Sequence, residues 1–143
     1  MWEQLKLPYV FERMIAFSIP ENDEILIESY DGWHLLKLAP EVSVAHDPEG
    51  AEDQCDVDRM LGLEGGAPIM EDSQRGHRLT LELARERLLI HDSGGGLVQE
   101  IEFSDLSGDW GYATYSKDAA WLLIGAPYDL YVYRWSDLMA NRS

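Results

Sequence analysis

One run of the sequence combines a base, a carboxylate, a hydroxyl and flexible backbone, namely His91-Asp92-Ser93-Gly94-Gly95-Gly96. These residue types occur in hydrolase and phosphate-binding loops, but a catalytic triad is brought together by the fold and not by adjacency in sequence. Moreover, no Lys follows its glycines, the next residues predict a strand instead of a helix, and the chain has no Gly-x-Ser-x-Gly motif. Because Gly and Asp also supply the positive φ angles of hairpin turns, we interpret the run as a turn. We expect no catalytic residues here or elsewhere, and therefore no enzyme.

Carboxylates crowd residues 47–58, and their oxygens are the ligands that Ca²⁺ prefers: Asp47, Glu49, Asp53, Asp56 and Asp58. The spacing does not fit a calcium loop, since counting from Asp56 puts Leu61 where Gly is required. The four His residues show no ligand spacing either, and Cys55 is the only Cys. We expect no metal and no other cofactor, and interpret these carboxylates as a charged loop or a partner surface.

The charge of the chain argues against two classes of partner. Its 27 acidic and 11 basic residues give a net charge of −16, and residues 41–76 alone carry 10 acidic and 2 basic side chains. A field of this sign repels the phosphates of nucleic acids and anionic lipids, so we expect neither nucleic acid nor membrane as a partner. A basic protein would instead be attracted.

The 143 residues, 45% of them hydrophobic, are enough for one domain with its own core, which we place at residues 1–143. The first residues lack the basic start and apolar run of a signal peptide, and no stretch approaches the ~18 apolar residues of a membrane span. With no disulfide framework either, we expect a cytoplasmic protein.

Period-two alternation of apolar and polar residues predicts strands in most of the chain. It is clearest at residues 79–83, 97–103 and 131–135. Short turn sequences such as Tyr30-Asp31-Gly32 lie between such segments, which indicates antiparallel hairpins. Residues 78–89 would also fit a helix, and we predict two strands joined near residues 84–86.

The acidic residues 41–76 interrupt this pattern. Their Pro and Gly content disfavours a long regular element, so we predict an irregular acidic insertion, with a short helical turn near residues 57–63.

A weak internal repeat links three hairpins. Residues 25–27, 88–90 and 122–124 are short apolar runs that each open a hairpin, and the second strands are residues 35–38, 97–101 and 131–135.

Residues 110–137 resemble a blade of a WD-repeat or related β-propeller. Tyr115-Ser116-Lys117-Asp118 stands where that family has Phe-Ser-Pro-Asp, and the run from Asp129 to Trp135 stands where it has Asp, any residue and Thr-Val-Arg-Leu-Trp. Residues 14–38 and 76–103 are similar to a blade more loosely. The resemblance implies blade-like antiparallel meanders and a scaffold that binds proteins.

A closed propeller needs at least four blades of about 40 residues, and this chain is too short for that. We therefore predict an all-β fold of blade-like hairpin units, either an incomplete propeller or a small sheet or sandwich. The acidic segment would protect its open edges, or several copies would complete one another as a homo-oligomer.

Three aromatic residues on predicted loops are candidate partner contacts. Trp110 and Tyr112 flank Gly111, and Tyr128 lies at a hairpin tip. Rings on loops above a rigid sheet bury much area at small entropic cost. We expect these three residues, with the carboxylates between Asp47 and Asp58, to contact a partner.

Two functions follow from these observations. The first is a non-enzymatic protein-binding or scaffold module, which the resemblance to propeller repeats favours. The alternative is an acidic inhibitor or immunity-type protein, in which residues 47–58 mimic phosphate charge and neutralise a basic nuclease-like toxin.

Overall fold

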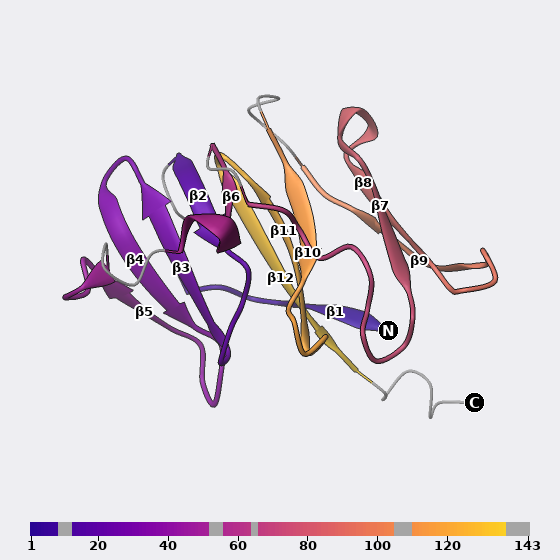
Figure 1. Ribbon diagram of the computed structural model, residues 1–143. Coiled ribbons are helices and arrows are strands. Elements are labelled where there is room, and N and C mark those ends of the chain that lie inside the picture. The colour runs from indigo at the N-terminus through magenta and orange to yellow at the C-terminus, as the bar shows by residue number, and fades with distance from the viewer. Residues whose placement is uncertain (9–12, 52–55, 64–65, 105–109, 137–143) are drawn as a thin grey trace.

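A computed structural model of the chain describes residues 1–8, 13–51, 56–63, 66–104 and 110–136 (Figure 1). These residues form three antiparallel sheets and only short helical turns, which confirms the all-β prediction. No helix long and apolar enough to cross a membrane occurs among them.

The three sheets differ in their number of strands. The five-stranded sheet has the order β5 (Ser43–His46), β4 (Gly32–Lys37), β3 (Glu24–Ser29), β2 (Met14–Ser18) and β6 (Met60–Gly62). The four-stranded sheet has the order β1 (Trp2–Leu5), β12 (Asp129–Trp135), β11 (Trp121–Ala126) and β10 (Tyr112–Tyr115). The three-stranded sheet has the order β7 (Arg78–Glu82), β8 (Arg87–His91) and β9 (Leu97–Glu102).

The hairpins expected from the repeat are present as β3–β4, β8–β9 and β11–β12. The two strands predicted within residues 78–89 are also confirmed, as β7 and β8. A 3₁₀ turn at Leu83–Arg85 joins them, and Glu86 ends it with a φ of 53°. The His91-to-Gly96 run forms the β8–β9 turn, in which the Asp92 carboxylate accepts the N–H groups of Gly94 and Gly96.

The four-stranded sheet lies between the other two (Figure 1). Trp121 and Leu123 of β11 pack with the core of the five-stranded sheet, whereas Leu122 and Ile124 pack with the core of the three-stranded sheet. All six residues of β11 are buried. A strand covered on both faces has no polar face, which explains why this stretch is a continuous apolar run.

The acidic segment 41–76 is less irregular than predicted, because its few apolar residues pair with sheet edges. It supplies β5, which pairs with β4, and β6, which pairs with β2. Leu61 of β6 is fully buried in the core, and this burial stabilises so short a strand. Of the helical turn expected near residues 57–63, only a 3₁₀ turn at Val57–Arg59 is present, and Met60–Gly62 form strand β6 instead.

The same segment also pairs with the two remaining sheets. The Ile69 carbonyl accepts the N–H of Tyr115 on β10 at 2.9 Å, and the Met70 carbonyl accepts the N–H of Leu79 on β7 at 2.9 Å. Residues 41–76 therefore cover one edge of β4, β2, β10 and β7, in agreement with the expectation that they protect open edges.

A glycine in β11 allows the two larger sheets to approach. A Cβ built on Gly125 would overlap the ring of Phe17, which is itself fully buried.

We expect Gly125→Ala to destabilise the protein by about 1–3 kcal/mol through overpacking, as measured by urea denaturation. Gly94→Ala is the matched control, because a Cβ there lies 3.4 Å from its nearest neighbour, the Asp92 carboxylate. Equal stabilities of the two variants would contradict the contact between Phe17 and Gly125.

Candidate functional site

Strand registers define two ends of the molecule. Strand β2 begins with Met14 beside Ser29, at the end that carries the β3–β4 turn. It finishes with Ser18 beside Met60, near the β2–β3 turn. We call the first the Tyr30 end and the second the Glu21 end.

The Tyr30 end holds a mainly apolar pocket of about 200 Å³, lined by Arg13, Met14, Ile15, Tyr30, Leu63, Trp110 and Pro127. Tyr30 is 64% exposed and Leu63 is 69% exposed. Trp110 is half-buried, and its ring stacks on Phe17 with 6.3 Å between the ring centroids. The pocket therefore has a fixed aromatic wall and two apolar side chains that point to solvent.

Backbone hydrogen bonds fix the segments that line this pocket. The N–H of Met14 donates to the Pro127 carbonyl, which ties the β11–β12 turn to β2. The N–H of Leu63 donates to the Ile15 carbonyl at 2.9 Å, and the N–H of Tyr30 donates to the Arg13 carbonyl at 3.3 Å. The apolar side chains thus stand on an ordered backbone, which lowers the entropic cost of binding.

The structure brings all three predicted aromatic contacts to this end, because Tyr112 pairs with Gly125 next to the β11–β12 turn. Trp110 lines the pocket, and Tyr128, 41% exposed, follows Pro127 in the β11–β12 turn. Tyr112 is half-buried in β10 and packs against the core beside Trp110. In the sequence Tyr30 is only part of a turn, and no pattern distinguishes Leu63 within the acidic segment.

The predicted carboxylates do not form one cluster, because β5 and β6 lie at opposite edges of the five-stranded sheet. Asp47 lies at the Tyr30 end, where its N–H donates to the Trp33 carbonyl at 2.7 Å, and the exposed Glu49 follows it. Asp56 lines a pocket at the Glu21 end, and its carboxylate accepts the N–H of the exposed Asp58 at 3.1 Å. Asp53 lies outside the described residues.

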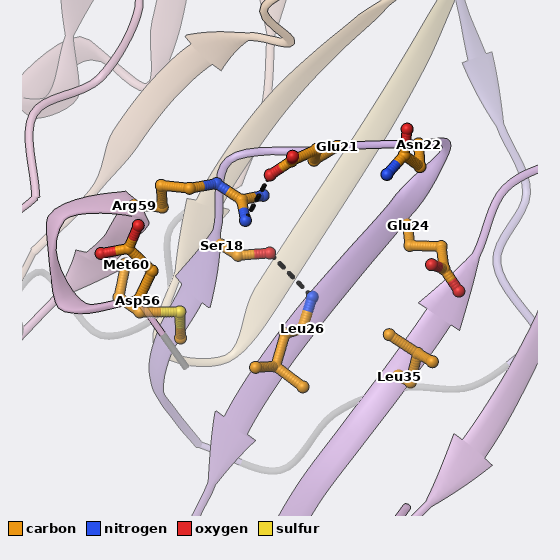
Figure 2. A pocket seen from close by; sticks show the side chains of 9 residues that line it. All are labelled: Ser18, Glu21, Asn22, Glu24, Leu26, Leu35, Asp56, Arg59 and Met60. Atoms are coloured by element: carbon orange, nitrogen blue, oxygen red, sulfur yellow. Dashed lines mark hydrogen bonds and ion pairs between the residues drawn. The ribbon is translucent and has the colours of Figure 1, made fainter. Parts of the chain in front are cut away.

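The pocket at the Glu21 end is acidic and has a volume of about 240 Å³ (Figure 2). Ser18, Leu26, Leu35 and Met60 form its floor, and five more polar residues surround them: the half-buried Glu24 and Arg59 and the exposed Glu21, Asn22 and Asp56. Figure 2 shows Arg59 turned toward Glu21, and their ion pair measures 2.5 Å. Three carboxylates against one guanidinium leave this pocket with net negative charge.

A second pocket adjoins it between the β2–β3 and β10–β11 turns. It shares Glu21 and Asn22 with the first and adds Asp23, Lys117 and Asp118. The indole N–H of Trp121 donates to the Asp23 carboxylate at 2.7 Å, which joins the two larger sheets here.

Ser29, Asp31 and His34 have the residue types of a hydrolytic triad but not its geometry. The hydroxyl of Ser29 and the carboxylate of Asp31 both lie near His34 Nε2, at 3.0 and 3.3 Å, while His34 Nδ1 lies 2.8 Å from His46 Nδ1. A triad histidine must instead meet the Ser and the Asp through different nitrogens.

This network holds the β3–β4 turn. The hydrogen bond that Ser29 donates to Asp31 is the main cause that lowers the pKa of that carboxyl, and His34 adds to it. His34 and His46 meet because they are directly opposed in the β4–β5 register. Within the described residues, no group of three or more His, Cys, Asp or Glu side chains is placed to hold a metal ion.

One carboxylate of the acidic segment has a structural role. Asp72 is fully buried and forms a 2.7 Å ion pair with Arg75. Arg75 also donates to the Ala119 carbonyl at 3.2 Å, and its guanidinium carbon lies 4.2 Å from the centroid of the Trp135 ring. The pair thus fastens the acidic segment to the four-stranded sheet.

Comparison with family models, with curated proteins and with solved structures finds no match for this chain. The resemblance to a propeller blade therefore stays a prediction from residues 110–137.

We expect Arg75→Met to destabilise the protein by roughly 3–5 kcal/mol, because the buried Asp72 carboxylate keeps its two backbone N–H donors but loses its positively charged partner. The matched control is Arg78→Met, since Arg78 and Glu71 are exposed and 3.9 Å apart. An exposed pair of this kind contributes about 0–1 kcal/mol. Thermal unfolding of the two variants tests the difference, and a control loss as large as that of Arg75→Met would contradict it.

Proposed function

We propose that the chain is a non-enzymatic protein-binding module that docks its partner at the Tyr30 end. One observation carries the proposal: Tyr30 and Leu63 are 64% and 69% exposed on an ordered backbone, beside a pocket of about 200 Å³. Aromatic and apolar side chains of this kind, placed next to a pocket, are the usual anchors of protein interfaces.

Three features of the Tyr30 end favour a protein over a small molecule. Its exposed rings, Tyr30 and Tyr128, stand on separate turns, so a ligand that touches both must extend over several elements. The pocket beside Tyr30 is large enough for a single apolar side chain of a partner. The carboxylates of Asp47 and Glu49 lie on the same end, so a partner with basic residues around an apolar anchor complements it.

An acidic inhibitor is the second candidate, and the pocket in Figure 2 favours it. Glu24 and Asp56 border this pocket together with the apolar Leu26 and Leu35. A lysine or arginine of a basic nuclease-like toxin would place its aliphatic stem on the leucines and its charge beside the carboxylates. In this proposal the Glu21 end, instead of residues 47–58 as one cluster, mimics phosphate charge.

Two double variants separate these functions. We expect Tyr30→Ser with Leu63→Ser to reduce capture of the partner from lysate of the source cells at least tenfold, since anchors of this kind dominate binding energy. Glu24→Gln with Asp56→Asn is the matched control at the Glu21 end. Captured proteins are quantified by mass spectrometry, at low and high salt.

The pattern of loss decides between the two candidates. Loss confined to the carboxylate variant, with strong salt dependence and a basic captured protein, would favour the inhibitor and contradict docking at the Tyr30 end. Capture that neither variant reduces would contradict both. All four residues lie at least partly in solvent, so melting temperatures close to that of the unaltered chain are expected and are measured in parallel.

A further inference from the structure

The three sheets are not equally complete. The meander β2–β3–β4 continues into a fourth antiparallel strand, β5, and the meander β10–β11–β12 is completed by β1. The meander β7–β8–β9 has no such fourth strand among the described residues, so β9 forms the outer edge of its sheet. The equivalent strands of the other two sheets, β4 and β12, each pair with a further strand on the side where β9 has none among the described residues.

The backbone of β9 directs peptide groups to this open edge. The N–H of Phe103 donates to the Glu86 carbonyl at 3.0 Å, so these opposed residues form a hydrogen-bonded pair. Along an antiparallel ladder, hydrogen-bonded pairs of opposed residues alternate with pairs that are not hydrogen-bonded to each other. Ile101 and Gln99 consequently bond to β8, whereas Glu100 and Glu102 point their N–H and C=O groups away from it.

The outer edges of the other two sheets are better protected. On β1, the Gln99 side-chain amide occupies both peptide groups of Trp2, accepting its N–H at 2.9 Å and donating to its carbonyl at 3.0 Å. β5 has only four residues and lies between Pro40 and Pro48. β9 has six residues, and none of the described segments pairs with its outer side.

The charge of the edge selects its occupant. Glu100 and Glu102 are exposed, and the single Arg87 beside them is shared between Glu82 at 2.6 Å and Glu100 at 3.2 Å. Pairing β9 with β9 of a second copy would bring these carboxylates together on two chains of charge −16. A strand with basic residues is complementary, and the 58% exposed Leu97 offers it an apolar contact.

We propose that the outer edge of β9 accepts an extended segment of another protein as a fourth strand, with Lys or Arg alternating with apolar residues. The main-chain N–H and C=O groups of Glu100 and Glu102 bind this segment by hydrogen bonds. The carboxylates of the same two residues favour a segment with positive charge. No residue of β9 lines the pocket at the Tyr30 end, so this inference goes beyond the proposed function and does not depend on it.

A short acetylated and amidated peptide in which Lys and Val alternate is the probe, titrated into the full chain at physiological salt by calorimetry. Glu100→Pro removes an outward N–H, which edge strands tolerate, whereas Glu100→Ala removes only the carboxylate. We expect Glu100→Pro to weaken binding at least about tenfold and Glu100→Ala at most about threefold.

A second peptide tests the main-chain bonds from the ligand side. It has the same sequence and carries N-methyl groups on alternate residues, which removes donors without changing charge, and we expect it to lose binding. The proposal is overturned if the first peptide does not bind, if the Pro and Ala variants bind it equally, or if the methylated peptide binds as well. Should Glu100→Pro fail to fold, the two peptides on the unaltered chain decide the question.

Discussion

Every side chain of β11 lies inside the protein, so this strand needs an apolar sheet against each of its faces. The five-stranded sheet supplies one cover and the three-stranded sheet the other. Gly125 lets the Phe17 ring lie directly on the strand, which brings the two larger sheets into contact. Stacked sheets of this kind share side chains, so each of the three depends on its neighbour for much of its buried surface.

Local pairing was predictable from the sequence, and long-range pairing was not. The β3–β4, β8–β9 and β11–β12 hairpins follow from apolar runs separated by turn residues. The sequence did not predict β6, because Met60 and Leu61 are its only two large apolar residues and show no alternating pattern. Its partner β2 also lies some forty residues earlier in the chain. Nor does the repeat indicate that the third hairpin unit packs between the other two.

The candidate site shows the same division. Trp110 and Tyr128 could be proposed because each is a large ring beside turn residues. Tyr30 and Leu63 join them only through the packing of the β3–β4 turn and the exit from β6. Asp47 and Asp56 are close in sequence but separated in space, because β5 and β6 lie at opposite edges of the five-stranded sheet. Proximity in sequence was therefore a poor guide to proximity at the surface.

The pairing of β1 with β12 has a consequence for biosynthesis. Trp2 lies opposite Trp135, so β1 joins a strand that is synthesised after all the other strands described here. Until β12 has been synthesised, β1 has no strand to pair with, and the indole of Trp2 cannot be buried in the four-stranded sheet. The entropy of closing so long a loop delays this step further. The four-stranded sheet is thus completed only after the strands of the two outer sheets have been translated. Until then, the apolar faces of the outer sheets stay exposed in the nascent chain, where they favour aggregation.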